Sequence, residues 1–499
     1  MLAATASGGQ ETTGKWPGSW DSRTARVAAC LVAALFWTIG SLHRSLWEDE
    51  FHSMYHARAG SVPALLASVR GDNHPPLSFL LQKLSCSLLG ESAFALRFPS
   101  LLAGLGLLLV FLRLSRRLPD ADARGIAPWL AVASSYVFWF VTAARMYALV
   151  ALATLGLVES VLATLEGKRS RWWIAAWIAL GLHAHYHFFH HLALLGLAGL
   201  ALYLGSPEIR RALRSCILPG LLGLALFAPW AAYAFWHQLG TGDPPTSSNR
   251  GFFVWCESYA QFLFINARAG GPFVLYGLAL PGVFAGALLG VLGISHVLRA
   301  GRNSGARAFP AALLVLGIIG PSWIYLADLV HTRSGFNLKY LSSYGAPALL
   351  IVAAGVGGSI WRRALSAFLL VAMLAVTLVN VASPGRQDVR GAVAFILEHA
   401  RPGDAVLVHP WWFRDPENSP TDYGWYARRL AGDREGPLEV PIARTADACS
   451  QPRVWLIHTS AYRRWAMTML SEHFGSVETF PCSPEVTVYL YTNPRAETH

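Results

Sequence analysis

Charged residues are scarce in this chain. Of its 499 residues only 14% are charged, whereas 54% are hydrophobic, and the mean hydropathy is +0.39. A soluble protein of this size covers its surface with more charge, so a large soluble helical protein is disfavoured. The 19 tryptophans suit a chain that meets two membrane–water interfaces. Composition therefore predicts an integral membrane protein.

Other signals are also missing. Six cysteines are too few for a disulfide scaffold; Cys449 and Cys482 could form one bridge, which spacing alone does not decide because the Cα separation is unknown. No P-loop or dinucleotide fingerprint is present, so we expect no nucleotide cofactor. No small-residue cleavage site follows the first apolar run, so this run is expected to be an uncleaved signal anchor.

Long apolar runs fill most of the chain. A bilayer core of about 30 Å requires about 20 apolar residues, and this criterion predicts about eleven transmembrane helices. These predicted spans are residues 27–43, 95–114, 126–142, 146–165, 172–187, 189–205, 215–236, 272–298, 309–328, 340–358 and 363–382. The first 26 residues are polar, and residues 383–499 form a separate C-terminal domain.

Basic residues predict the orientation of these spans. If the N-terminus is cytoplasmic, every second gap between spans is basic, as the positive-inside rule requires. The basic residues of these gaps are Lys15, Arg23, Arg26, Arg113, Arg116, Arg117, Arg124, Lys168, Arg169, Arg171, Arg210, Arg211, Arg214, Arg299, Arg302, Arg307, Arg362 and Arg363. The pattern holds only if residues 75–90 form a helix along the outer surface instead of a span. The domain at 383–499 is then extracytoplasmic, and topology explains the net charge of +11 without a nucleic-acid partner.

The first outer loop, residues 44–94, carries three consecutive carboxylates, Glu48, Asp49 and Glu50. Ionisable residues beside a membrane span are candidate functional residues by default. The alternative is an acidic patch that merely marks the outer face. Further along the loop, the run His74-Pro75-Pro76 could equally be an ordinary helix start.

Cations near the outer ends of spans oppose the usual charge bias, so they are expected to have an anionic partner. They are Arg97, Arg145 and Lys339. A phosphate group is the obvious partner, although each cation alone could snorkel or pair with a carboxylate. His183 and His187 have a metal-ligand spacing, but no carboxylate or cysteine lies nearby in sequence, so packing or hydrogen bonding is the favoured interpretation.

An ordered series of motifs resembles the GT-C glycosyltransferases that use polyprenyl-phosphate sugars, the group of the protein O-mannosyltransferases and the lipid A aminoarabinose transferase. Each motif is weak alone, and the order and topology carry the resemblance. The motifs are Asp49-Glu50, Asp72-Asn73-His74-Pro75-Pro76-Leu77, Leu89-Gly90, Leu96-Arg97-Phe98-Pro99-Ser100 with Gly104, Ala144-Arg145-Met146-Tyr147-Ala148-Leu149, His185-Tyr186, Ala228-Pro229-Trp230, Lys339-Tyr340-Leu341, Arg386-Gln387-Asp388-Val389-Arg390-Gly391 and Pro402-Gly403-Asp404.

The resemblance implies an inverting transferase in which an acceptor oxygen displaces polyprenyl phosphate from the sugar. It implies Asp49 as the catalytic base, and Glu50, which points about 100° away on a helix, as a positioning carboxylate. Arg145 and Lys339 would contact the donor phosphate. Supporting residues of the donor site would be Tyr147, Tyr340, His74, Arg97, His185 and Tyr186. We also expect burial to raise the pKa of Asp49. No cofactor is expected, and a divalent metal is left open as a possibility that the sequence does not indicate.

Two positions depart from the family pattern. The family often has a carboxylate two residues before the arginine of the fourth span, where this chain has Ala143. It often has arginine where this chain has Lys339, and lysine supplies charge without a bidentate fork. The reaction class is unaffected, but the donor and the phosphate geometry stay open.

The C-terminal domain has the pattern of a small α/β fold. Strands are predicted at 404–409, 454–458 and 486–491, and helices at 386–400, 421–431 and 461–473. The sequence leaves two roles open for this domain, acceptor docking and a lid. Its aromatic residues, Trp411, Trp412, Trp425 and Tyr426, could stack on sugar rings or fill the core.

Two other functions compete with the transferase. A lipid or glycolipid transporter would show internal repeats and charges near span midpoints, and neither is clear. A membrane sensor gives no reason for Asp49, Glu50 and Arg145 to line one face. The sequence thus predicts a multi-pass plasma-membrane enzyme with a polyprenyl-phosphate-linked sugar as donor, and it leaves open whether the acceptor is a glycolipid, a polysaccharide or a protein.

Overall fold

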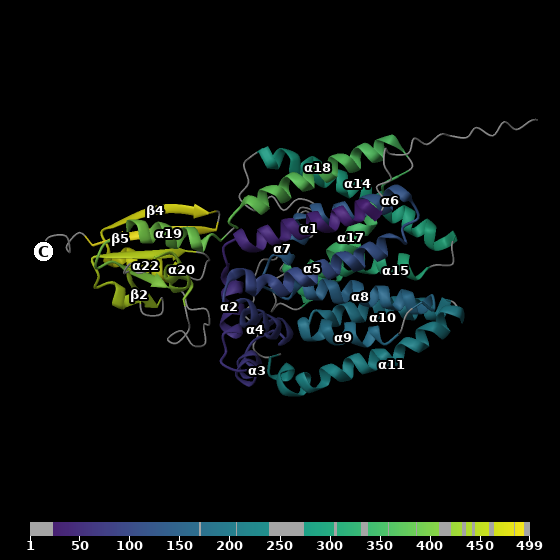
Figure 1. The fold of residues 1–499 in the computed structure, drawn as a ribbon, viewed down its shortest axis with the longest axis horizontal. Coiled ribbons are helices and arrows are strands. Elements are labelled where there is room, and N and C mark those ends of the chain that lie inside the picture. Colours follow the sequence, from purple (N-terminus) through teal and green to yellow (C-terminus); the bar gives the residue numbers. More distant parts are fainter. Residues whose placement is uncertain are drawn as a thin grey trace, which may run out of the picture.

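The structure is a computed structural model of the chain. It describes residues 23–168, 171–205, 207–238, 274–303, 307–330, 338–357, 359–385, 387–408, 421–431, 436–441, 445–458, 464–483 and 485–493. Within these ranges the chain forms a helical bundle up to residue 382, and a mixed sheet with helices lies at one end of the bundle (Figure 1).

The bundle is built from long helices and several short or broken ones. They are α1 (Arg23–His43), α5 (Ala93–Ser115), α6 (Ala121–Ala133), α7 (Ser135–Val141), α8 (Tyr147–Leu165), α9 (Trp173–Ala184), α10 (Phe188–Gly205), α11 (Pro207–Trp230), α12 (Trp236–Gln238), α14 (Val274–Asn303), α15 (Ala308–Leu314), α16 (Gly320–Val330), α17 (Ser342–Ala354) and α18 (Ile360–Ala382). Two π-helical segments, η1 (Ala231–Phe235) and η3 (Val315–Ile319), continue helices, and a 3₁₀ turn, η4 (Leu338–Leu341), leads into α17.

Eight helical segments of the described chain are long and apolar enough to cross a membrane, by length and composition. The predicted count of about eleven spans is therefore not confirmed. The run at 126–142 is divided at Ser134, whose hydroxyl accepts a hydrogen bond from the Val137 amide and so caps α7. The runs at 172–187 and 340–358 contain α9, with 12 residues, and α17, with 13; both are shorter than the bilayer requires.

Apolar side chains cover the outside of the bundle. Leu31 on α1 is 66% exposed, Leu197 on α10 is 65% exposed and Phe284 on α14 is 68% exposed, whereas α8 and α17 are almost wholly buried. A soluble surface rarely exposes so much contiguous apolar area. Together with the eight apolar helices, this belt identifies a multi-pass membrane protein.

Three short helices cover the end of the bundle that faces the C-terminal domain (Figure 1). They are α2 (Glu48–Ala57), α3 (Val62–Arg70) and α4 (Leu77–Leu89). The predicted surface helix at 75–90 is thus confirmed as a helix, which ends at Gly90 with φ +79°, a conformation that favours glycine. Its place relative to a bilayer stays a prediction.

The C-terminal part is a five-stranded sheet with helices, as the alternating pattern predicts. Its elements are α19 (Val389–His399), β1 (Ala405–Val408), α20 (Asp422–Leu430), β2 (Leu438–Pro441), α21 (Thr445–Ala448), β3 (Arg453–His458), α22 (Arg464–His473), β4 (Ser476–Ser483) and β5 (Val486–Thr492). The strand order is β2-β1-β3-β5-β4. Strand β1 is parallel to β2 and β3, with Ala405 opposite Leu438 and Val454, and β5 is antiparallel to β3 and β4.

A hydrophobic cluster joins this domain to the bundle. It packs Leu46, Phe51 and Met54 against Trp425 and Tyr426 of α20. The Tyr426 hydroxyl also accepts a hydrogen bond of 2.7 Å from the Leu46 amide. Trp425 and Tyr426 are therefore core residues and do not form a sugar platform; the two other aromatic candidates, Trp411 and Trp412, lie outside the described residues.

The two cysteines proposed as a bridge, Cys449 and Cys482, are free thiols in the structure. The Cys449 thiol donates to the Thr445 carbonyl, and the Cys482 thiol donates to the Phe480 carbonyl. Core packing therefore holds this domain together without the bridge.

Candidate active site

Helix α2 carries the acidic run directly after α1. Glu48, Asp49 and Glu50 occupy its first turn, where the positive end of the helix dipole stabilises negative charge. Glu50 Oε2 also accepts a hydrogen bond of 3.2 Å from the Trp47 amide, which caps the helix start. Because successive helical residues point about 100° apart, Asp49 and Glu50 enter different surroundings.

Glu50 is fully buried in an ion pair with Arg97. Arg97 Nε and Nη2 donate to the two carboxylate oxygens of Glu50 at 2.7 and 2.6 Å, and the remaining donors reach the carbonyls of Ser41, Arg44 and Ser45. All five N–H groups of Arg97 are thus used. The prediction that Arg97 binds donor phosphate is therefore wrong, because its guanidinium is 1% exposed and has no free donor. Both carboxylate oxygens of Glu50 are thus engaged by Arg97.

The loop between α7 and α8 presents Arg145 to the same region. The Ala144 amide donates to Glu50 Oε1 at 2.7 Å, and Gln82 of α4 donates to the Ala144 carbonyl at 2.8 Å. Ser100 of α5 donates to the Arg145 carbonyl at 2.9 Å. Side chains from three helices thereby fix an irregular backbone, as a preorganised binding group requires.

Arg145, Lys339 and Asp49 meet at the start of α2. Lys339 Nζ lies 2.7 Å from Asp49 Oδ2 and 4.4 Å from the centre of the Trp47 ring. Arg145 Nη1 donates to the Asp49 carbonyl and to the Ser53 hydroxyl, both at 3.2 Å. The Asp49 side chain stays 31% exposed. The structure thus joins one accessible carboxylate to two cations that lie far apart in the sequence.

The expected rise in the pKa of Asp49 is wrong in this state. Burial does raise the pKa of this carboxyl, but the charges of Lys339 and Arg145 outweigh burial and hold the pKa well below its usual range. Asp49 is therefore ionised at neutral pH. As a carboxylate, Asp49 can accept a proton, but it is a weak base while Lys339 is paired with it.

Aromatic and imidazole rings form one wall beside these charges. Tyr340 stacks on His187 with ring centres 4.1 Å apart and lies 5.6 Å from His185, which in turn lies 5.3 Å from His74. Tyr147, at the start of α8, stacks on Trp139 with ring centres 5.5 Å apart. Of the supporting residues, His74, Tyr147, His185 and Tyr340 thus lie together.

Tyr186 points elsewhere. Its hydroxyl donates to Gln238 Oε1 and accepts a hydrogen bond of 2.8 Å from Trp230 Nε1. Gln238 in turn donates to the backbone carbonyls of Val69 and His74. Tyr186 is therefore a brace for the loop that carries His74, and the prediction that it lines the donor site does not match its contacts.

Several buried polar atoms at the wall have no hydrogen-bond partner. They include Arg145 Nε, His185 Nε2 and His187 Nδ1. His74 Nε2 faces Arg145 Nη2 at 3.2 Å and must accept there. Buried polar groups in folded proteins are normally satisfied by protein or by ordered water, so these donors and acceptors are available to water or to a polar ligand.

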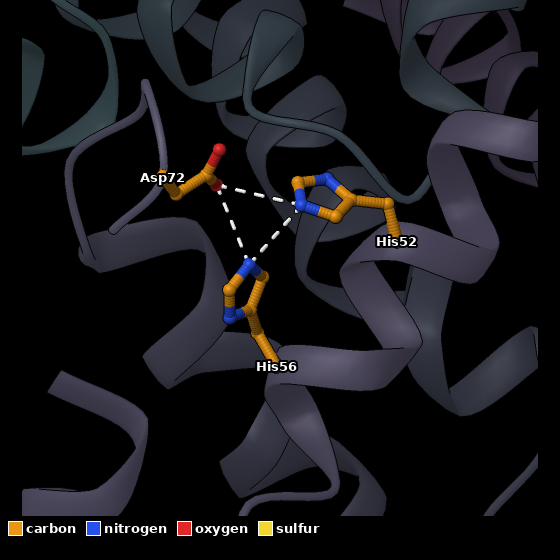
Figure 2. A group of neighbouring side chains, drawn as sticks. All are labelled: His52, His56 and Asp72. Atoms are coloured by element: carbon orange, nitrogen blue, oxygen red, sulfur yellow. Dashed lines mark hydrogen bonds and ion pairs between the residues drawn. The ribbon is translucent and has the colours of Figure 1, made fainter. Parts of the chain in front are cut away.

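His183 and His187, whose spacing is that of metal ligands, do not come together as a metal site in the structure. Helix α9 ends at Ala184, so His183 and His187 do not share a helical face, and His183 Nδ1 donates to its own helix at the Ala179 carbonyl. Within the described residues, one group has metal-ligand geometry: His52, His56 and Asp72 (Figure 2). The signal was available, because the two histidines are four residues apart immediately after the acidic run.

An apolar cavity of about 490 Å³ lies elsewhere in the bundle, between α8, α9, α10, α11 and α15. Tyr203 and Arg214 are its main polar lining residues, and no carboxylate contributes to it. It therefore suits a hydrocarbon chain and does not suit proton transfer.

The chain was compared with known proteins. Residues 73–233 match the family model described as dolichyl-phosphate-mannose-protein mannosyltransferase. This match confirms the resemblance to the GT-C glycosyltransferases. The matched region contains His74, Arg97, Arg145 and Tyr147, and it ends before Lys339. No curated protein matches the sequence significantly.

Solved structures of three glycosyl-transferring proteins match the chain at low identity. ArnT from Cupriavidus metallidurans bound to undecaprenyl phosphate is 13% identical, covers 94% of this chain and 98% of its own, and has a TM-score of 0.47. The oligosaccharyltransferase AglB from Archaeoglobus fulgidus, in complex with an inhibitory peptide and a dolichol-phosphate, is 13% identical, with coverages of 96% and 75% and a TM-score of 0.45. The arabinofuranosyltransferase AftD from Mycobacteria is 12% identical, with coverages of 94% and 41% and a TM-score of 0.43. TM-scores below 0.5 carry no inference about the site.

Proposed function

We propose that this membrane glycosyltransferase moves a sugar from a polyprenyl-phosphate donor to an acceptor oxygen, with inversion, at the outer face of the plasma membrane. The observation that carries the proposal is the accessible Asp49 carboxylate paired with Lys339, beside Arg145, which donates to the Asp49 backbone carbonyl. A carboxylate base and a cationic clamp are the two groups that displacement of a phosphate from a sugar requires. The matching family description also names a sugar linked to a polyprenyl phosphate, dolichyl-phosphate-mannose.

The reaction assigns one role to each group. The acceptor oxygen forms a bond to the anomeric carbon while the bond from this carbon to the donor phosphate oxygen breaks. The acceptor proton passes to Asp49, and the leaving polyprenyl phosphate keeps the bonding electron pair. Arg145 and Lys339 stabilise the negative charge that grows on this phosphate. Attack from the face opposite the leaving group inverts the anomeric centre.

The unused atoms of the site support phosphate binding. Arg145 Nε has no hydrogen-bond partner, and its guanidinium is 4% exposed, so a phosphate oxygen would satisfy a buried donor. His185 Nε2 has no partner either and lies on the same wall. Phosphate is the ligand class that arginine binds with both charge and directed hydrogen bonds.

Donor binding also explains how a carboxylate with a low pKa serves as base. Asp49 is a weak base in the free enzyme because Lys339 Nζ donates to Asp49 Oδ2 at 2.7 Å. A phosphate at the site competes for Lys339 and adds negative charge nearby, and both effects raise the pKa of Asp49. The base would thus become strong only when the donor is in place.

The proposed orientation follows from the basic gaps between spans. Residues 1–26 would be cytoplasmic, residues 27–382 would form the membrane domain, and residues 383–499 would lie outside. Helix α2, which carries Asp49, and the C-terminal domain lie at the same end of the bundle (Figure 1), so the acceptor would approach from the extracytoplasmic side. The acceptor class, whether glycolipid, polysaccharide or protein, is left to the assay.

The test is transfer from a panel of polyprenyl-phosphate monosaccharides by the purified protein in nanodiscs, with glycolipid, polysaccharide and peptide acceptors. The anomeric configuration of the product is read by NMR. Asp122→Asn is the matched control for Asp49→Asn, because the Asp122–Arg363 pair, like the Asp49–Lys339 pair, is partly exposed, and its N–O distance is 2.8 Å. We expect transfer with inversion by wild type and by the control. Retention of configuration would refute the mechanism. Donor movement across the nanodisc membrane without transfer would refute the enzyme class.

A further inference from the structure

Three potential metal ligands converge beside the proposed active site. His52 and His56 are four residues apart on α2, and Asp72 comes from the loop between α3 and α4 (Figure 2). His56 and Asp72 are buried, while His52 is partly exposed. This arrangement therefore has one open side, toward His52.

The distances between the ligand atoms suit one ion. His52 Nε2 and His56 Nε2 are 3.2 Å apart, and they lie 3.8 and 3.4 Å from Asp72 Oδ2. A triangle with these sides has a circumradius of about 2.0 Å, which equals the distance of zinc from imidazole nitrogen. An ion slightly out of this plane would be about 2.1 Å from each atom and would keep a fourth position open, as in three-ligand zinc sites.

The protein groups alone do not satisfy this cluster. Asp72 Oδ2 is buried, and its ion pairs with His56 Nε2 and His52 Nε2 are long, at 3.4 and 3.8 Å. The other carboxylate oxygen, Oδ1, accepts from the Asn73 amide at 2.6 Å. An unsatisfied buried carboxylate oxygen is costly. A cation between the three atoms removes this cost.

The second ring nitrogen of His56 is already held. His56 Nδ1 lies 3.0 Å from the Ser68 hydroxyl of α3. Metal-binding histidines are usually fixed through their other nitrogen in this way, which sets the ring orientation. Two imidazoles with one carboxylate favour zinc or a similar transition metal over magnesium or calcium, which prefer oxygen ligands.

We propose that His52, His56 and Asp72 bind one zinc-class divalent ion. The ion would tie α2, which carries Asp49, to the loop that carries His74, whose Nε2 contacts Arg145. It would thereby position the base relative to the phosphate-binding arginine. This positioning role rests on the proposed function, whereas the binding of the ion does not. The proposal departs from the sequence-based expectation that no cofactor is present.

Metal binding tests the proposal independently of transfer. The full chain in nanodiscs is stripped with a chelator, and zinc is titrated against a chromophoric competitor. We expect about one zinc ion per chain, no competition by Mg²⁺, and a visible absorption band of tetrahedral character when Co²⁺ replaces zinc. If the stripped wild type binds no zinc, the proposal is overturned.

Variants assign the site. His56→Ala and Asp72→Asn should each weaken zinc binding by at least about tenfold, since even outer-shell changes cost that much. His52→Gln, at the partly exposed ligand, provides a milder change if the buried variants do not fold. His183→Ala is the control, because it removes a histidine that lies outside the cluster. Unchanged affinity in the three ligand variants would overturn the site. Loss of zinc binding with transfer retained would overturn only the positioning role.

Discussion

Replacing Arg97 with alanine tests how the site is held in place. The substitution leaves the Glu50 carboxylate, which is fully buried, without its cation, and it removes the donors to the carbonyls of Ser41, Arg44 and Ser45. Breaking a buried ion pair by removing one partner costs about 3–5 kcal/mol. Because Glu50 also holds the Ala144 amide, the loop of Arg145 should loosen as well.

The assay is thermal unfolding in nanodiscs together with donor binding. The control is Arg117→Ala, which breaks the more exposed Arg117–Glu166 pair and should cost at most about 1 kcal/mol. We expect a large fall in the unfolding midpoint and weaker donor binding for Arg97→Ala, and a small change for the control. Equal midpoints for the two variants would refute the structural role assigned to Glu50 and Arg97.

Three further predictions follow from the contacts of the site. Arg145→Lys keeps the charge but loses the fork, so donor binding should weaken about ten- to hundredfold in a direct binding assay; unchanged affinity would exclude Arg145 from the phosphate site. Tyr426→Phe leaves the buried Leu46 amide unsatisfied, at about 1–3 kcal/mol, so limited proteolysis should release the C-terminal domain faster than in wild type. The pKa of Asp49 is depressed in the free enzyme, so Asp49 loses its charge only when the pH falls below its usual pKa of about 4. The pH profile of kcat/KM should accordingly show no loss of activity between pH 5 and 7 that is caused by protonation of Asp49.

Much of the fold could be predicted because burial and polarity leave direct signals in sequence. Strands β1, β3 and β5 are apolar and largely buried, so their runs stand out. Strand β4 is mostly exposed and gives no apolar alternation, and Leu438 and Glu439 of β2 are exposed as well. The division between α6 and α7 could not be seen in the sequence either, because the capping residue is a single serine within an apolar run and no helix-breaking residue marks the boundary.

The site was predictable as a set of residue types and not as a set of partners. Charges next to apolar spans marked Asp49, Arg145 and Lys339, and the structure brings them together. Which cation pairs with which carboxylate depends on helix phase and packing, so Arg97 was assigned to the donor although it belongs to Glu50. The predicted direction of the Asp49 pKa shift was wrong for the same reason, since the shift depends on a contact with Lys339, which is far away in the sequence.

The central claim is that Asp49 is the base and Lys339 a phosphate contact. The most direct measurement is single-turnover transfer alongside donor binding for Asp49→Asn and Lys339→Met. We predict that Asp49→Asn binds the donor at least as well as wild type and loses about 10²- to 10⁴-fold in the rate of transfer. Lys339→Met should instead weaken donor binding. Transfer at the wild-type rate by Asp49→Asn would contradict the account, as would unchanged donor affinity in Lys339→Met.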